Sequence, residues 1–250
     1  MAKDLFSQHA ADYAKYRPNY PAGLFDHLAS LVPLRGRAWD CATGNGQAAV
    51  GLAAHFEEVV ATDASVQQLA QAAPHPRVSY RVALAENSGL ESGSVDLVTV
   101  AQALHWFDLP QFYREARRVA RGPGAMLAVW CYALAEIEHG VDAVVRRYYD
   151  EVVGEYWEPE RRLVELGYQT IAWPFAAVPT PQFEMQVEWN LARLTCYLNT
   201  WSATQAATRA MARNPLDAIA HDLARAWGDP GQPRRVRWPL FLRLAKLVEL

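Results

Sequence analysis

The stretch Ala38–Ala53, AWDCATGNGQAAVGLA, decides how the rest of the chain is interpreted. From Gly44 it reads G-x-G-x-x-A, the loose form of a dinucleotide-binding fingerprint in which glycines let the backbone approach a ligand. Apolar residues precede the glycines, and an alanine-rich segment, Gln47–Ala54, follows them. We therefore expect a strand, a tight turn and a helix, with a ligand beside the amide groups at the helix start.

Around this turn, short apolar runs alternate with segments of helical periodicity. The expected strands are 38–42, 58–63, 78–82, 95–101 and a fifth within 122–132. Expected helices cover 65–73 and 109–120, the first with a capping box between Ser65 and Gln68 and an apolar stripe at Val66, Leu69, Ala70 and Ala73. Nearly all-apolar strands that alternate with helices predict a doubly wound, mostly parallel α/β sheet.

The remaining segments predict one domain, 1–250, with three parts. Residues 1–36 form an aromatic-rich lead-in that is expected to act as a lid, and residues 37–133 form the ligand-binding core. Residues 134–250 combine helical periodicity at 141–152 and 216–227 with expected strands at 183–190 and near 235–244. This last part is expected to complete the sheet and to cap the substrate site.

Composition excludes several classes of partner. The formal net charge of the 250 residues is −3, and no basic stripe is present, so nucleic acid is not an expected partner. No run of eighteen apolar residues indicates a membrane span. Three cysteines without metal-ligand spacing, and a start that lacks a secretory leader, predict a cytoplasmic protein without a metal site. Either a monomer or a homodimer is compatible with these features.

Two acidic residues near the glycine turn bear on the ligand. Asp63 ends the second expected strand nineteen residues after Gly44, the spacing at which an acid accepts hydrogen bonds from ribose hydroxyls. Asp40 lies four residues before Gly44, where a carboxylate would repel a pyrophosphate but stabilise an ammonium group. S-adenosylmethionine (SAM) carries a ribose, an ammonium and a sulfonium but no phosphate, so the turn favours SAM.

Two other functions remain open at this point. The G-x-G-x-x-A pattern also suits an NAD(P)-dependent oxidoreductase, although none of the eleven tyrosines is followed four residues later by the lysine that short-chain dehydrogenases use. A non-catalytic SAM-binding protein would carry the same turn.

Several motifs occur in one order along the chain: DCATGNGQAAVGLA, VVATDAS, VALAENSGLESGSVDLVTVAQALHWF and LAVWCY, preceded by FSQHAADYAKYRPNYP. This series resembles class I SAM-dependent methyltransferases, in particular methyltransferase type 11 and the trans-aconitate methyltransferase-like small-molecule group. The resemblance covers residues 6–132 and is looser beyond. It implies a Rossmann-like fold with a final antiparallel strand and a helical cap, SAM as methyl donor and S-adenosylhomocysteine as product.

The resemblance also implies roles for individual residues around the cofactor. Gly44 and Gly46, with the backbone at Ala42, would hold the methionine part, and Asp40 would lie near its ammonium. Asp63 would bind the ribose. The remaining implied cofactor contacts are Ala64, Ala85 and Glu86 at the adenine, Gln102 in the pocket wall, and Tyr13 and Arg17 closing over the cofactor, Arg17 at its carboxylate.

The stretch ALHWF follows the fourth expected strand, at the edge where open α/β sheets present groups to ligands. His105 is a candidate base or hydrogen-bond donor, and Trp106 is a candidate wall of the substrate site. The stretch lacks the Asn/Asp-Pro-Pro-Tyr/Phe pattern of enzymes that methylate nucleic-acid bases. We therefore expect methyl transfer to a small molecule, with carboxylate and aromatic metabolites as the acceptor classes.

Overall fold

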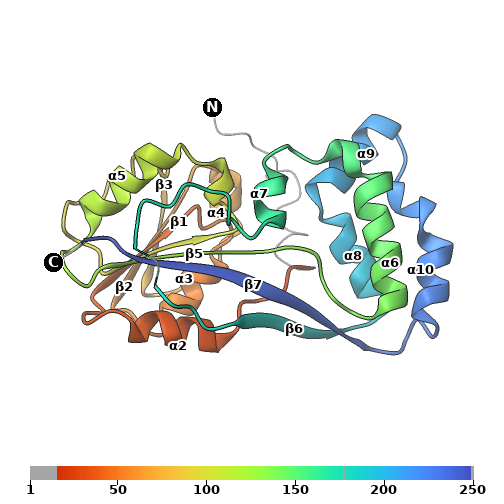
Figure 1. Cartoon of the computed structure of the whole chain (residues 1–250), viewed down its shortest axis with the longest axis horizontal. Coiled ribbons are helices and arrows are strands. Elements are labelled where there is room, and N and C mark those ends of the chain that lie inside the picture. The colour runs from red at the N-terminus through yellow and green to blue at the C-terminus, as the bar shows by residue number, and fades with distance from the viewer. Residues whose placement is uncertain (1–15, 177, 249–250) are drawn as a thin grey trace.

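The computed structural model of the chain describes residues 16–176 and 178–248, and its centre is one seven-stranded sheet (Figure 1). The order of the strands is β3-β2-β1-β4-β5-β7-β6. Their bounds are β1 (Arg37–Cys41), β2 (Glu58–Asp63), β3 (Val78–Val82), β4 (Leu97–Ala101), β5 (Met126–Tyr132), β6 (Phe183–Trp189) and β7 (Arg234–Lys246). The expected strands 58–63 and 78–82 have these same limits.

Strand direction determines where a ligand can bind. The pairs among β3, β2, β1, β4 and β5 are all parallel, whereas β7 is antiparallel to both β5 and β6. Asp40 on β1 lies opposite Ala61 on β2 and Thr99 on β4. The carboxyl ends of these three strands therefore meet at one edge of the sheet. The doubly wound, mostly parallel fold with an antiparallel strand is confirmed.

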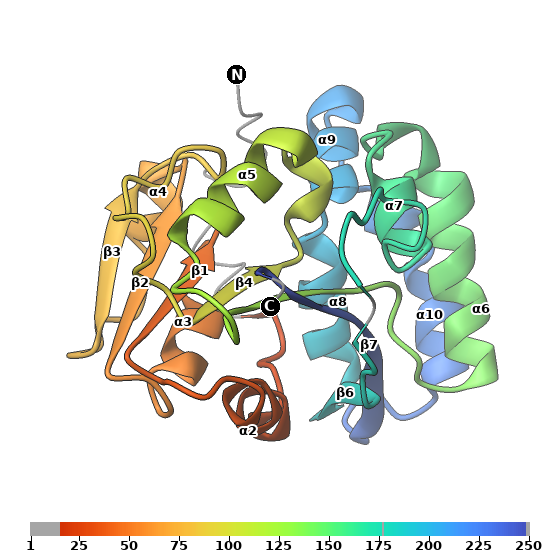
Figure 2. The same cartoon turned by 60° about the vertical axis from the view of Figure 1, so that its left-hand side comes forward.

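Helices cover both faces of the sheet (Figure 2). The α-helices are α2 (Ala22–Ser30), α3 (Gln47–Leu52), α4 (Val66–Leu69), α5 (Leu109–Val119), α6 (His139–Arg147), α7 (Arg161–Glu165), α8 (Leu191–Asn199), α9 (Ser202–Met211) and α10 (Ala220–Trp227). On β5 the residues alternate between the two faces: Trp130 packs in the cluster with α2 and α3, and Cys131 packs in the cluster with α5. Burial on both faces is why the strand is apolar throughout.

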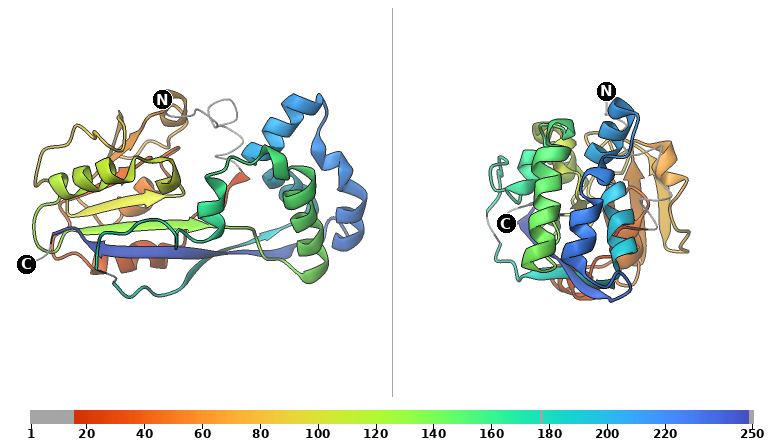
Figure 3. Two further views of the ribbon diagram at one scale, coloured as in Figure 1. Left: turned by 45° about the horizontal axis from the view of Figure 1, so that its top comes forward. Right: turned by 90° about the vertical axis from the view of Figure 1, so that its right-hand side faces the viewer.

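Helices α6, α8, α9 and α10 gather at one end of the molecule, which we call the helical lobe (Figures 1 and 3). The long strand β7 begins beside this lobe and runs away from it through the sheet. Large aromatic residues fill the junction, with Trp238 of β7 packed on Tyr197 of α8 at 5.4 Å between ring centroids. The Trp238 Nε1 group donates a hydrogen bond to the Tyr197 hydroxyl at 3.1 Å. The lobe is thus joined to the sheet through a buried aromatic contact.

The structure corrects two local predictions near α4. The helix ends at Leu69 rather than at residue 73, and Val66, expected in its buried stripe, is 59% exposed. Pro74 disfavours helical conformation at the residue before it, which limits the helix. The capping box is half formed: the Ser65 hydroxyl accepts from Gln68 N, but Ser65 N donates to Asp63 Oδ1. The side chain of Gln68 is therefore not used in the cap.

Two further features concern the lobe and the membrane. The helical periodicity of 141–152 is not one α-helix, because α6 ends at Arg147 and a π-helical turn, Tyr148–Val152, follows. Such turns are frequently found at functional sites. None of the helices in the described ranges has the length and apolarity to cross a bilayer.

Candidate functional site

A cavity of about 470 Å³, here called the main cleft, opens at the carboxyl ends of β1, β2 and β4. Its walls come from the glycine turn, the start of α4, the loop 83–86 and the segment after β4. Of the expected cofactor residues, the structure brings seven together on this lining: Ala42, Gly44, Asp63, Ala64, Ala85, Glu86 and Gln102. Trp106 also lies on it.

The backbone of the main cleft is held in unusual conformations. Gly44 and Gly46 have φ angles of 59° and 86°, the left-handed region that glycine enters without steric cost. Ala42 and Gln102 adopt φ angles of 54° and 57° although they carry a Cβ atom. Such strain concentrates where a ligand site requires it. The two strained residues follow β1 and β4, directly at the cleft.

Gly46→Ala should disrupt this turn. A Cβ atom at Gly46 would overlap the Tyr80 hydroxyl oxygen and lie 3.0 Å from Cε1 and Cζ of the same ring, in addition to the cost of a positive φ. Gly93→Ala is a matched control, because Gly93 has a φ of 67° but nothing within 4 Å of the added atom. We expect the control to lose about 1–2 kcal/mol of unfolding free energy and Gly46→Ala to lose roughly 1–3 kcal/mol more. Equal losses in urea unfolding would contradict the contact.

Asp63, at the end of β2, ties the turn to α4. Its Oδ2 accepts a hydrogen bond from Gly44 N at 2.8 Å, and its Oδ1 accepts one from Ser65 N at 2.8 Å. An ionised carboxylate offers about four lone-pair sites, so it can accept from ligand hydroxyls as well. Asp63 therefore both shapes the main cleft and presents a carboxylate to it.

Asp40 does not line the main cleft but lies beneath the glycine turn, 1% exposed. The hydroxyls of Thr43 and Thr99 donate to its two carboxylate oxygens, at 2.5 and 2.7 Å. Burial raises the pKa of Asp40 from 3.8 to about 6, against the lowering effect of these hydrogen bonds. A cation bound over the turn would favour the ionised carboxylate, so Asp40 can act on a ligand through its charge.

The charges on the main cleft select the type of ligand. Its lining includes the carboxylates of Asp63, Glu86 and Glu160, and no Lys, Arg or His of the described ranges. Such a lining would repel the two phosphates of NAD(P) and attracts the cationic sulfonium and ammonium of SAM. Gln68 also belongs to this lining, and its buried amide oxygen, Oε1, has no hydrogen-bond partner among the described residues. An unused acceptor suits the hydroxyl or ammonium donors of SAM.

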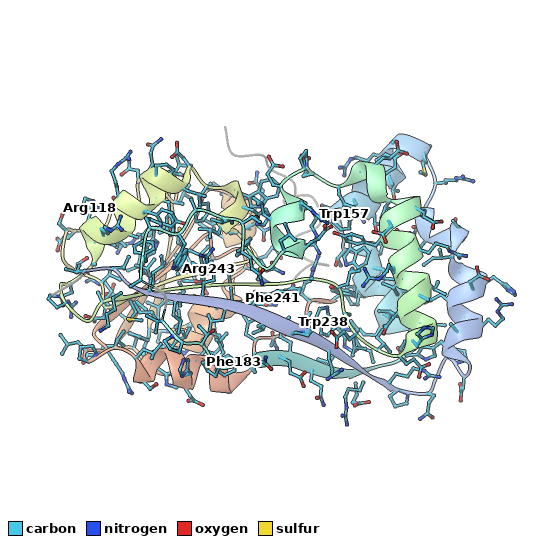
Figure 4. All side chains as sticks on the ribbon, viewed as in Figure 1. Arg118, Trp157, Phe183, Trp238, Phe241 and Arg243 are labelled. Carbon is cyan, nitrogen blue, oxygen red and sulfur yellow. The ribbon has the colours of Figure 1, made fainter. Side chains whose placement is uncertain are left out.

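The loop that carries Ala85 and Glu86 is anchored to α5. Buried Glu115 accepts hydrogen bonds from Ser88 N and from the Ser88 hydroxyl, and it pairs with Arg118 at 2.7 Å (Figure 4 labels Arg118). The Glu86 carboxylate accepts from Asp108 N, at the N-cap of α5, at 2.9 Å. The loop expected to contact the adenine is therefore held to α5 at two places, through Ser88 and through Glu86.

A second, smaller cavity of about 70 Å³, here called the side cavity, adjoins the main cleft. Gln102 and Trp106 line both spaces, so they form the boundary. The remaining lining is largely aromatic and comes from the end of β5, the segment before α7 and the helical lobe: Tyr132, Trp157, Tyr197 and Trp201. Three charged side chains, Arg17, Glu158 and Arg161, lie on it.

Two expected site residues belong to the side cavity. Arg17 lies there rather than in the main cleft: its Nη1 donates to the Tyr132 hydroxyl at 3.3 Å, and its guanidinium stacks on Tyr197. His105 lies there too. Gly46 lines neither space but begins α3 beneath the main cleft. Tyr13 lies outside the described residues.

His105 is held in a neutral state. Its Nδ1 is 2.8 Å from the hydroxyl of the buried Tyr168, and its Nε2 makes no hydrogen bond to any described residue. Burial, together with the charge of Arg161, lowers the pKa of His105 to about 3. Neutral imidazole can orient an acceptor through a hydrogen bond, but it cannot serve as a cationic acid near neutral pH.

Sequence reasoning missed Gln68, Glu160 and Arg161. The sequence marked Gln68 only as a partner in the capping box. Its side chain is not used there because Ser65 N donates its hydrogen bond to Asp63 Oδ1 instead. Glu160 and Arg161 lie in the region of looser resemblance, and no motif marks them. As for metals, the described ranges hold no group of three or more His, Cys, Asp or Glu arranged for an ion; the absence of a metal site stays a prediction.

Comparison with known proteins agrees with this site. A family profile described as a methyltransferase domain matches residues 39–128. A Dictyostelium discoideum protein named as a methyltransferase is 32% identical over 250 residues, which cover 97% of this chain and 95% of that protein.

A solved structure from Anaeromyxobacter dehalogenans, named as a type II methyltransferase, is 46% identical, with a TM-score of 0.88 over 94% of this chain and 100% of that one. A Saccharomyces cerevisiae relative named as SAM-dependent is 26% identical over 173 residues, or 64% of this chain and 59% of that protein. With the Rossmann-like sheet and the acidic main cleft, these likenesses show that the chain belongs to the methyltransferase-domain family of SAM-dependent enzymes.

Proposed function

We propose that the enzyme methylates a small-molecule acceptor, carboxylate or aromatic, in the side cavity. The observation that carries this proposal is the shared boundary: Gln102 and Trp106 line both the main cleft and the side cavity. A methyl donor in one space and an acceptor in the other would meet there. Site residues keep their proposed roles, with Gly44, Ala42 and Asp63 at the donor and Ala64, Ala85 and Glu86 at its nucleoside.

The size and the walls of the side cavity support a small, flat acceptor. One water needs roughly 10–15 Å³ of such volume, so a side cavity of about 70 Å³ has room for more than a water but remains small. Indole and phenol rings provide flat apolar walls with polar edges. These features support a metabolite rather than a nucleic acid. A cytoplasmic location, and a monomer or homodimer, remain part of the proposal.

The chemistry needs little beyond alignment. Bound SAM supplies an electrophilic methyl group on a sulfonium, which leaves as the neutral thioether of S-adenosylhomocysteine. The chain's task is to orient the acceptor's lone pair towards that carbon and to exclude water, which can account for roughly 7–11 kcal/mol of the barrier. Neutral His105 can accept a hydrogen bond from an acceptor hydroxyl, and Trp106 can wall the site. A carboxylate acceptor requires no proton removal.

Calorimetric titration tests the donor half of this function. S-adenosylhomocysteine should bind the enzyme, and NAD⁺ should not, because the main cleft offers carboxylates rather than cations to a pyrophosphate. Methyl-labelled SAM incubated with the enzyme and a small-metabolite extract should then yield a labelled product by mass analysis. Binding of S-adenosylhomocysteine without any labelled product would identify a binding protein instead.

A further inference from the structure

We propose that Arg161 is the anchor for a carboxylate on the methyl acceptor, so that the substrate is a small planar monoanion. This inference rests on the proposed function of the side cavity and makes it more specific. The features that carry it are the way Arg161 is held, the groups of its guanidinium that remain available, and the charge of the surrounding lining.

Arg161 is fixed at one end only. Its Nε donates a hydrogen bond to the Tyr149 hydroxyl at 2.9 Å, and Tyr149 in turn donates to Glu165. Its guanidinium carbon lies 5.0 Å from the Trp157 ring centroid and 5.6 Å from that of Tyr149. Figure 4 shows Trp157 between α7 and the helical lobe. Stacking and one hydrogen bond therefore set the plane of the guanidinium.

The outer fork of the same guanidinium remains available. Neither Nη1 nor Nη2 of Arg161 makes a hydrogen bond to a described residue, and no described carboxylate lies within ion-pair distance of this side chain, which lines the side cavity. Two parallel N–H groups in a plane match the two oxygens of a carboxylate. A fork held rigid at its Nε loses little further freedom when it binds.

The support beneath Arg161 is itself unusual. Tyr149 and its neighbours form the π-helical turn Tyr148–Val152 that ends α6. Trp157 donates a hydrogen bond from Nε1 to Tyr149 O at 3.2 Å, and Trp201 of the lobe packs on both rings. These contacts link α6, α7 and α9 around one cation. The aromatic side chains that hold Arg161 and its neighbours thus come from the π-helical turn, the segment before α7 and the residue before α9.

The charge of the side cavity favours a single negative charge on the ligand. Its described lining holds two arginines and one glutamate, Arg17, Arg161 and Glu158, while His105 is neutral. The formal balance is therefore one positive charge, which a monoanion neutralises. The flat aromatic walls at Trp106 and Trp157 suit a planar group next to the carboxylate.

Benzoate and benzamide are probes of equal shape that differ in charge. We expect benzoate to bind the enzyme saturated with S-adenosylhomocysteine roughly 10- to 100-fold more tightly than benzamide, the preference typical of a charge-assisted fork. Arg161→Gln should remove this preference, and Arg161→Lys should restore part of it. Arg209→Gln is the matched control, because Arg209 is an exposed arginine of α9 in the helical lobe and lines neither cavity.

Cofactor binding separates this inference from the proposed function. Arg161→Gln should bind S-adenosylhomocysteine as the wild type does, because Arg161 does not line the main cleft. The carboxylate anchor alone would be overturned if the wild type binds S-adenosylhomocysteine but does not prefer benzoate to benzamide. It would also be overturned if the Arg161→Gln variant keeps the preference for benzoate. Failure of the wild type to bind S-adenosylhomocysteine would overturn the proposed function itself.

Discussion

Asp63→Ala is expected to weaken S-adenosylhomocysteine binding at least about 100-fold, because two hydrogen bonds to an ionised acceptor, each worth about 1.5–3 kcal/mol, shape the main cleft. The alanine leaves Gly44 N and Ser65 N without their present acceptor. It also removes the carboxylate available to the ribose hydroxyls. Calorimetric titration of the variant gives the change in dissociation constant directly.

Two variants make this result specific. Glu57→Ala removes an exposed carboxylate next to the start of β2, whereas Asp63 ends this strand. This control should leave the dissociation constant for S-adenosylhomocysteine unchanged. Asp63→Asn keeps one oxygen acceptor and should fall between the wild type and alanine, provided that circular dichroism shows all three variants folded. An Asp63→Ala dissociation constant within about threefold of the wild type would rule out this role.

Asp40→Asn is expected to stabilise the ligand-free protein near neutral pH while weakening its affinity for SAM. Burial raises the pKa of Asp40 from 3.8 in the unfolded chain to about 6 in the folded protein, so protonation of Asp40 favours the folded state. This stabilisation is complete below pH 3.8 and is lost as the pH rises through 6. This pKa shift corresponds to a free energy of unfolding that is about 3 kcal/mol lower at pH 7 than at low pH. Asparagine removes the buried charge, and the Thr43 and Thr99 hydroxyls can hydrogen-bond to its amide.

The measurement is the difference in unfolding free energy between Asp40→Asn and wild type from pH 4 to pH 8, by urea unfolding. The difference curve is needed because His105, whose pKa is lowered to about 3, acts in the opposite sense and favours folding less as the pH falls below 6.5. We expect Asp40→Asn to gain stability over wild type as the pH rises from 4 to 7. A flat difference would contradict the raised pKa.

Asp96→Asn is the matched contrast. Asp96 is equally buried, at 4% exposed, but it pairs with Arg121 at 3.2 Å and accepts from Gly36 N and Arg37 N. Removing a paired charge leaves its partners unsatisfied, so this variant should lose about 1–3 kcal/mol at pH 7. Asp40 on β1 and Asp96 just before β4 are thus expected to change stability in opposite directions when replaced by asparagine, since of the two only Asp96 has a cationic partner in the described structure.

Much of the sheet could be predicted from the sequence, for a physical reason. Strands buried on both faces are largely apolar, and β2 has the limits that its apolar run indicates. The edge strand β3 is only partly buried, and its β-branched and aromatic residues at alternate positions, Val78, Tyr80 and Val82, indicate its limits instead. The turn at Gly44 and the acid at Asp63 are also local features. Local sequence patterns were insufficient where contacts with other segments set the end of a helix. Helix α4 is shorter than its periodicity suggests, and α6 is followed by a π-helical turn.

The sequence by itself determined the fold, the glycine turn and the methyl donor, because each depends on residues close together along the chain. Only the tertiary structure decided that Asp40 is buried beneath the turn, and that Arg17 and Arg161 both line the side cavity. Such contacts join residues far apart, as His105 and Tyr168 show across 63 positions. The glycine turn of the proposed donor site is a local motif, whereas the side cavity, the proposed acceptor site, is lined by residues that are far apart in the sequence.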